Sequence, residues 1–310
     1  MRLDDQRRSD NIEDRRGQSG GGGLGGGGGG LRFGGRGIGL GGIIIIGLVM
    51  LFFPPARQLL PMLLGQGGGS EQTSSEPGAV GAPKDAAGDF LGGVLGSTED
   101  VWAQTFASGA MAHYGYQGRE YTPTRLVMFS GQTGTRCGTG TAAVGPFYCP
   151  GDQHVYIDTD FFKLMKDRFG ASGDFAQAYV VAHEVGHHIQ TLVGISDQVQ
   201  QMKARGGERE SNALQVRMEL QADCFAGMWG KKLAEQRTAA GQPRLEAGDF
   251  DEAMVAANAI GDDTLQRQAR GYVQPDSFTH GTSEQRKRWF TKGFETGDPA
   301  QCDTFNARSL

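Results

Sequence analysis

The segment HEVGHH, residues 183–188, contains three of the six histidines in this 310-residue chain and a glutamate between them. His183 and His187 are four positions apart, so on a helix both imidazoles lie on one face and can reach a single cation. Neutral imidazole nitrogen is a preferred ligand of Zn²⁺, and a catalytic zinc site keeps one position for water. Glu184 lies beside these ligands, where its carboxylate can accept a proton from that water. The pattern predicts a catalytic zinc site; the alternative is a core helix that happens to carry histidines.

Core-type side chains surround this motif, at Val180, Val181, Ala182, Val185 and Ile189. They predict a buried environment, in which an imidazole is costly unless it is hydrogen-bonded or bound to metal. Gly186 costs about 1 kcal/mol relative to alanine inside a helix, which a need for space for substrate or for a neighbouring element would explain. His188 is one step off the ligand face, so we interpret it as a residue that supports a ligand or lies on the surface.

A zinc site needs a third protein ligand. The extended pattern HExxHxxGxxH would require glycine at position 190 and histidine at 193, but the chain has Gln190 and Val193. A downstream carboxylate remains, because Glu219 and Asp223 stand four apart in the otherwise apolar segment RMELQADCFAGMW, where acids are costly without a cation or donors. We predict that Glu219 is the third ligand and that Asp223 orients a ligand imidazole. A solvated acidic face is the alternative.

Hydrophobic periodicity places these motifs on helices of one α+β domain, residues 97–310, which is mainly helical with a small sheet. The domain is expected to begin near Ser97, at a helix-start pattern. Strands are expected at Arg125–Ser130 and His154–Asp158. Helices are expected at Phe161–Phe169, Phe175–Leu192, Asp197–Lys203, Ser211–Gln236, Asp249–Gln268 and Ser283–Thr296.

The composition changes sharply before this domain. Residues 1–36 are rich in glycine and arginine and predict a disordered cytoplasmic tail. Residues 37–56 carry no charge and are just long enough for one transmembrane helix, and residues 57–96 predict a flexible linker. Arginines before the span predict a single-pass protein with its N-terminus cytoplasmic and its catalytic domain outside. A cleaved signal peptide and a buried core helix are the alternatives, but no small-x-small cleavage site closes the apolar run.

All four cysteines follow the apolar stretch, as an oxidising compartment would allow. Sequence alone permits three pairings; we favour Cys137–Cys149, which would close a short loop, and Cys224–Cys302, which would tie down the C-terminal tail. Four reduced thiols are the alternative. The net charge of −5 and the lack of a basic cluster interleaved with aromatics in the last two thirds argue against a nucleic-acid partner.

Four segments, HEVGHHIQ, ELQADCFAG, GPFYCPGDQHVYID and SFTHGTSEQRKRWF, together resemble the bacterial membrane-anchored neutral zinc metallopeptidase family. The likeness covers nearly the whole chain, including its Arg-rich start and the apolar anchor. The acidic motif from Glu219 to Asp223 is also similar to that of zincin-fold gluzincin proteases of the HtpX and CAAX-prenyl-protease kind, in which the glutamate is the third zinc ligand. The resemblance implies a protein of the bacterial cytoplasmic membrane that hydrolyses peptides with one Zn²⁺ per chain; it supplies no physiological substrate.

Two weaker expectations concern the substrate. The segment THGTSEQR, residues 279–286, resembles the T-H-x-x-S-x-x-R segment of the HtpX group, which implies that His280 stabilises the tetrahedral oxyanion. The alternative is a histidine that caps the following helix. The strand His154–Asp158 is predicted to be the edge strand that pairs with an extended substrate backbone. His113 and His154 are interpreted as structural.

Three functions stay open at this point. In an anchored zinc endopeptidase, zinc would polarise the scissile carbonyl, and Glu184 would deprotonate water and later protonate the leaving amine. A non-catalytic zinc-binding or assembly module would need a fourth protein ligand, and no obvious one is present in the sequence. An amidase acting on cell-wall peptides would use the same catalytic residues as the endopeptidase.

Overall fold

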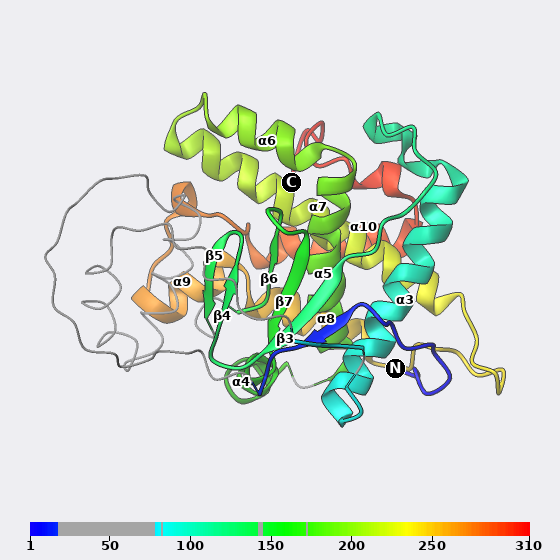
Figure 1. Cartoon of the computed structure of the whole chain (residues 1–310). Coiled ribbons are helices and arrows are strands. Elements are labelled where there is room, and N and C mark those ends of the chain that lie inside the picture. Colours follow the sequence, from blue (N-terminus) through cyan, green and yellow to red (C-terminus); the bar gives the residue numbers. More distant parts are fainter. Residues whose placement is uncertain (18–77, 82, 142–144, 172) are drawn as a thin grey trace, which may run out of the picture.

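A five-stranded mixed sheet lies against a group of long helices in the computed structural model (Figure 1). The structure describes residues 1–17, 78–81, 83–141, 145–171 and 173–310. The class is α+β and mainly helical, as the sequence predicted. In the described part of the chain no helix has both the length and the apolar character needed to cross a membrane, and the anchor predicted at residues 37–56 lies outside that part.

The sheet has the strand order β2-β1-β3-β7-β6. The strands are β1 (Ile12–Asp14), β2 (Ala79–Val80), β3 (Arg125–Phe129), β6 (Phe147–Cys149) and β7 (His154–Asp158), with a separate hairpin of β4 (Gln132–Thr135) and β5 (Gly138–Thr141). β3 pairs in parallel with both β1 and β7, while β2 and β6 run antiparallel to their neighbours. Four consecutive residues of both β3 and β7 are buried, as expected of strands that are covered on both faces.

Two sequence predictions were wrong about which segments form the sheet and in what order. Residues 1–17, expected in a disordered tail, are part of the folded unit: β1 lies inside the sheet, and the α-amino group of Met1 is 2.8 Å from Asp174. β7 is internal, so the strand expected at the edge is flanked by β3 and β6. The edge on the β7 side of the sheet is β6, which has only three residues, too few for periodicity to reveal.

The helices carry the catalytic motifs and most of the core. They are α3 (Ala86–Ser108), α4 (Asp160–Phe169), α5 (Asp174–Leu192), α6 (Ile195–Lys203), α7 (Glu208–Ala234), α8 (Asp249–Ala259), α9 (Asp262–Arg270) and α10 (Ser283–Thr296), with 3₁₀ turns η2 (Ala110–Tyr114), η4 (Pro275–Ser277) and η5 (Pro299–Cys302). α3 begins after Asp85, whose side chain accepts a hydrogen bond from the Gly88 amide. The predicted linker at residues 57–96 therefore extended too far, and residues 86–96 are helical.

Glycines allow α5, α7 and α10 to pack backbone against backbone. A Cβ on Gly186 of α5 would lie 3.0 Å from the Ala222 backbone of α7. A Cβ on Gly293 of α10 would lie 1.9 Å from the Cys224 carbonyl, and one on Gly227 would lie 2.0 Å from the Phe290 carbonyl. Gly186 thus makes room for a neighbouring element, one of the two reasons expected from sequence, and the close approach holds the HExxH face of α5 against α7.

The helix expected at Asp249–Gln268 is two helices, α8 and α9, separated at Ile260 and Gly261. Gly261 lies where a Cβ would be 2.4 Å from the Ser283 hydroxyl, so the chain turns there against the start of α10.

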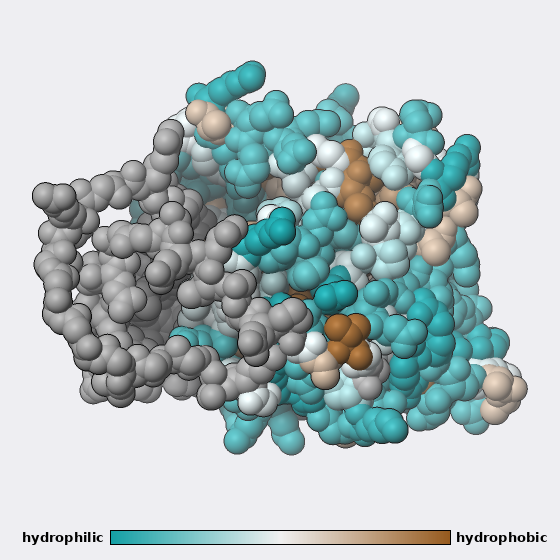
Figure 2. All heavy atoms as spheres, in the orientation of Figure 1, coloured by the Kyte–Doolittle hydropathy of each residue, from teal (hydrophilic) through white to brown (hydrophobic). Residues whose placement is uncertain are grey.

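Both predicted disulfides, Cys137–Cys149 and Cys224–Cys302, are confirmed. The face drawn in Figure 2 is mostly hydrophilic where it is coloured, with isolated apolar patches.

Candidate metal centre

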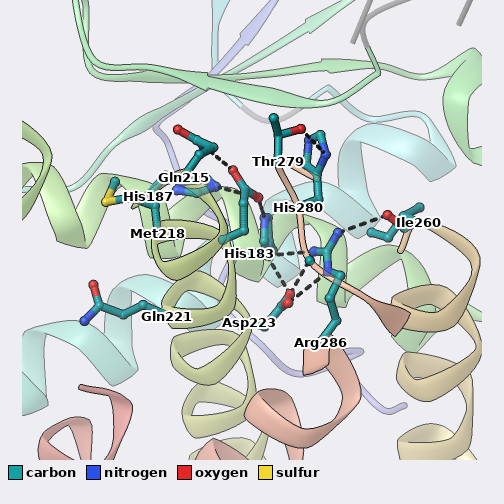
Figure 3. A network of polar contacts seen from close by, with 12 residues as sticks. His183, His187, Gln215, Met218, Gln221, Asp223, Ile260, Thr279, His280 and Arg286 are labelled. Carbon is teal, nitrogen blue, oxygen red and sulfur yellow. Dashed lines mark hydrogen bonds and ion pairs between the residues drawn. The ribbon is translucent and has the colours of Figure 1, made fainter. Parts of the chain in front are cut away.

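Three predicted ligands from two helices form one group of candidate metal-binding atoms. Figure 3 labels two of them, His183 and His187. His183 and His187 come from α5 and Glu219 from α7. The Oε2 atom of Glu219 is 3.2 Å from His183 Nε2 and 3.5 Å from His187 Nε2. Ligand atoms on a tetrahedron with zinc bonds of 2.0–2.1 Å would be roughly 3.3 Å apart. The donor types and their spacing therefore fit Zn²⁺.

Asp223 orients His183 through Nδ1, the ring nitrogen that faces away from the other candidate ligands, and this is the role predicted for Asp223. The Nδ1 atom of His183 is 2.8 Å from Asp223 Oδ1, which also accepts a hydrogen bond from the Tyr179 hydroxyl at 2.5 Å. Arg286 donates through Nε and Nη2 to the two oxygens of Asp223, each at 2.9 Å. Because Nδ1 faces a carboxylate, it carries the proton in the neutral, metal-binding form of the ring, and the Nε2 lone pair is then available to a cation.

His187 is held differently, by the neutral side chain of Gln190. Its Nδ1 atom is 2.8 Å from Gln190 Oε1. Glu219 has its own support, because Gln215 Nε2 donates to Oε1 at 2.7 Å and leaves Oε2 facing the two imidazoles. Lys203 in turn donates to Gln215. Each of the three candidate ligands thus has a partner that fixes its orientation.

Electrostatics in the metal-free protein reflect this clustering. Burial disfavours the charged imidazole of His183, but Asp223 and the hydrogen bond to Glu219 together outweigh it and raise the pKa of His183 to about 9. Burial alone would raise the pKa of Glu219, yet His187 and the hydrogen bond from His183 hold it well below its ordinary value. A buried carboxylate that stays ionised between two imidazoles is a centre that a cation can occupy.

Glu184 lies next to the ligand face with a carboxylate that is free to act as a base. It is 7% exposed, and its carboxylate makes no hydrogen bond with any residue that the structure describes. Burial raises its pKa, against the opposing effects of His183 and His187. A carboxylate with a raised pKa and no protein partner is suited to accept a proton from water.

His280 lies beside the same cluster in Figure 3, on a loop that Asp262 holds in place. Oδ2 of Asp262 accepts the backbone amides of Thr279, His280 and Gly281, at 2.7, 2.6 and 3.2 Å. Oδ1 is 3.2 Å from His280 Nδ1. The cap of α10 is Thr282, whose side chain accepts from the Gln285 amide, so the capping role considered for His280 was wrong.

The remaining histidines do not join the donor group. His188 is fully buried: its Nε2 is 2.7 Å from the Thr122 carbonyl and its Nδ1 is 3.1 Å from the Tyr148 hydroxyl, so the surface alternative was wrong. His113 lies 3.4 Å from Asp303, and His154 lies in β7. Both of these agree with the structural roles expected of them.

Several supporting residues were missed from sequence, although helical spacing could have revealed some. Tyr179 is four positions before His183, Gln190 is three after His187, and Gln215 is four before Glu219, each therefore on the face of its ligand. Asp262 and Arg286 come from other elements, and no local spacing links them to the ligands.

Fold and site together define an α+β protein in which the two histidines of HExxH and a downstream glutamate form one candidate metal centre. The chain belongs to the family described as "Putative neutral zinc metallopeptidase", whose model matches residues 1–305. "Uncharacterized protein YpfJ" of Escherichia coli K12 is 47% identical over 305 residues, 98% of this chain and 99% of the relative. "Uncharacterized protein Rv2575" of Mycobacterium tuberculosis H37Rv is 47% identical over 195 residues, 61% of this chain and 65% of that relative. No solved structure matches significantly.

Proposed function

We propose that this protein is a zinc-dependent endopeptidase. The observation that carries the proposal is the convergence of His183 Nε2, His187 Nε2 and Glu219 Oε2. Glu184 is the neighbour of His183 in the chain, and its carboxylate makes no hydrogen bond within the described part of the chain. Bound there, zinc would supply Lewis acidity toward the scissile carbonyl and a more acidic water. Glu184 accepts the proton of the attacking water and returns it to the leaving amine. His280, oriented by Asp262, donates a hydrogen bond to the developing oxyanion.

The edge strand β6 is the proposed docking element for an extended substrate. It ends the sheet and packs against α5, the helix that carries the motif. An extended peptide could add to this edge through main-chain hydrogen bonds, which impose little sequence preference. This assigns to β6 the role that sequence reasoning gave to β7.

A purely structural zinc module is the less favoured function. Such a site is closed by four protein ligands, whereas in the described part of the chain only three His, Cys, Asp or Glu residues form this group.

The two disulfides support action in an oxidising compartment outside the cytoplasm. Attachment to a membrane through residues 37–56 stays a sequence-based expectation.

The decisive experiment compares the wild-type protein with Glu184→Gln. We expect the variant to keep its zinc, measured by metal analysis, and to lose at least about 100-fold in hydrolysis of an unstructured protein substrate, because it lacks the base. Glu208→Gln, at an exposed position on α7, is the matched control and should retain full activity. Unchanged activity in Glu184→Gln, or a wild-type protein that binds no zinc, would contradict the proposal. Cleavage of cell-wall peptides alone would assign the amidase function instead.

A further inference from the structure

Gln190 fixes which nitrogen of His187 carries the proton. Both N–H groups of its amide have acceptors, because Nε2 is 2.8 Å from the Met218 carbonyl and 3.0 Å from Gln221 Oε1. The amide oxygen must then face His187 Nδ1, 2.8 Å away, since the opposite orientation would place two oxygens against the Gln190 oxygen. His187 Nδ1 is therefore the donor, and in the neutral ring the lone pair is on Nε2, which is 3.5 Å from Glu219 Oε2.

The orientation of Gln221 is fixed in the same way, further from the metal centre. Its Oε1 accepts from Gln190, and its Nε2 donates to the Cys302 carbonyl at 3.1 Å. Cys302 lies in η5 and is joined to Cys224 of α7 by a disulfide. Gln190, Gln221 and both cysteines are fully buried, so water does not compete for these hydrogen bonds.

We propose that Gln190 and Gln221 form a neutral positioning relay, anchored on the Cys302 carbonyl by the Cys224–Cys302 disulfide, which fixes the tautomer and ring orientation of His187 for zinc. This inference rests on the proposed zinc site, but not on its catalysing peptide hydrolysis. The relay differs from the support of His183, where the charge of Asp223 is balanced by Arg286. Neither Gln190 nor the Asp223–Arg286 ion pair adds net charge to the metal centre. With two imidazoles and one carboxylate as its protein ligands, bound Zn²⁺ would therefore keep a net positive charge.

The first test measures zinc affinity by chelator competition in the full-length protein carrying Gln190→Leu. Loss of a partner behind a metal-bound histidine typically lowers metal affinity 10- to 100-fold, and we expect a decrease of about that size. Gln200→Leu, at an exposed position on α6, is the matched control and should bind zinc as the wild type does. The visible absorption spectrum of the Co²⁺-loaded protein should change in Gln190→Leu but not in Gln200→Leu, because the orientation of the His187 ring alters the ligand field.

The second test uses Gln221→Leu, alone and combined with Gln190→Leu. In a relay the second substitution removes little once the first is present, so the losses in zinc affinity should be clearly less than additive. Cys224→Ser combined with Cys302→Ser should weaken zinc binding in the same direction as Gln221→Leu. Unchanged zinc affinity in Gln190→Leu would overturn the relay. If Gln190→Leu does not fold, unchanged zinc affinity in Gln221→Leu would overturn it instead. Additive losses of zinc affinity in the double variant would also overturn it. Normal zinc binding without peptidase activity would instead overturn the proposed function alone.

Discussion

Asp223 is the carboxylate on which the hydrogen bonds behind His183 converge. It is fully buried, and its charge is balanced by Arg286, which is 2% exposed. Burial alone would raise the pKa of Asp223, but Arg286 and His183 lower it below its ordinary value. The buried pair therefore matters both to the stability of the α7–α10 contact and to the orientation of one ligand.

Arg286→Leu is expected to destabilise the metal-free protein by about 3–5 kcal/mol, because it leaves a buried carboxylate without its partner. Urea unfolding measures the change. Arg288→Leu, on the same helix but half-exposed, should cost less than about 1 kcal/mol. Equal effects of the two substitutions would show that burial of the Asp223 pair has no special importance.

His280→Ala is expected to lower kcat about 100-fold, as removal of an oxyanion donor does. Asp262→Ala should lower kcat in the same direction by a smaller factor, since the loop loses its acceptor while His280 remains. Zinc affinity should be unchanged in both variants, and Asp251→Ala, at an exposed position on α8, should leave kcat unaltered. A loss confined to zinc binding would refute the oxyanion role.

At the scale of elements, His188 fastens α5 to the edge strand and to the chain before β3 through Tyr148 and Thr122. Burial lowers its pKa to about 4, compared with about 6.5 in an unfolded chain. Between these values the unfolded state binds the proton and the folded state does not. Stability is therefore lost as the pH falls from about 6.5 toward 4.

This linkage predicts that wild-type protein loses about 2 kcal/mol more stability than His188→Gln between pH 7 and pH 5. The substituted amide does not titrate and can still donate to the Thr122 carbonyl. Urea unfolding at both pH values gives the difference, and other titrating groups cancel in the comparison. Identical pH dependence in the two proteins would mean that His188 is not the neutral, buried contact described above.

Local periodicity explains which parts could be predicted from sequence. His183, His187, Glu219 and Asp223 were found because four-residue spacing on a helix is visible in the chain itself. Strand pairing joins residues far apart in sequence, so the positions of β1 and β6 in the sheet were missed. The break between α8 and α9 depends on the approach of Ser283 to Gly261, a tertiary contact that no local pattern records.

At the scale of the whole molecule, residues 1–17 complete the sheet and core. Ile12 is fully buried between β2 and β3. Ile12→Ala is expected to lower the free energy of unfolding by about 2–5 kcal/mol through the lost burial and the cavity left behind. Asp10→Ala, two positions away and exposed, should change it by less than about 0.5 kcal/mol. A negligible effect of Ile12→Ala would mean that this segment is not part of the cooperative fold.

The position of β1 also limits how the chain can be placed relative to a membrane. Ile12–Asp14 are hydrogen-bonded to β2 and β3, which follow residue 78 in the chain. A bilayer crossed once between residues 17 and 78 would separate these strands. The orientation inferred from the arginines, with the N-terminus cytoplasmic and the catalytic domain outside, is therefore incompatible with this sheet. Any membrane attachment consistent with this sheet would leave both ends of that segment in one compartment, together with the two disulfides and the metal centre.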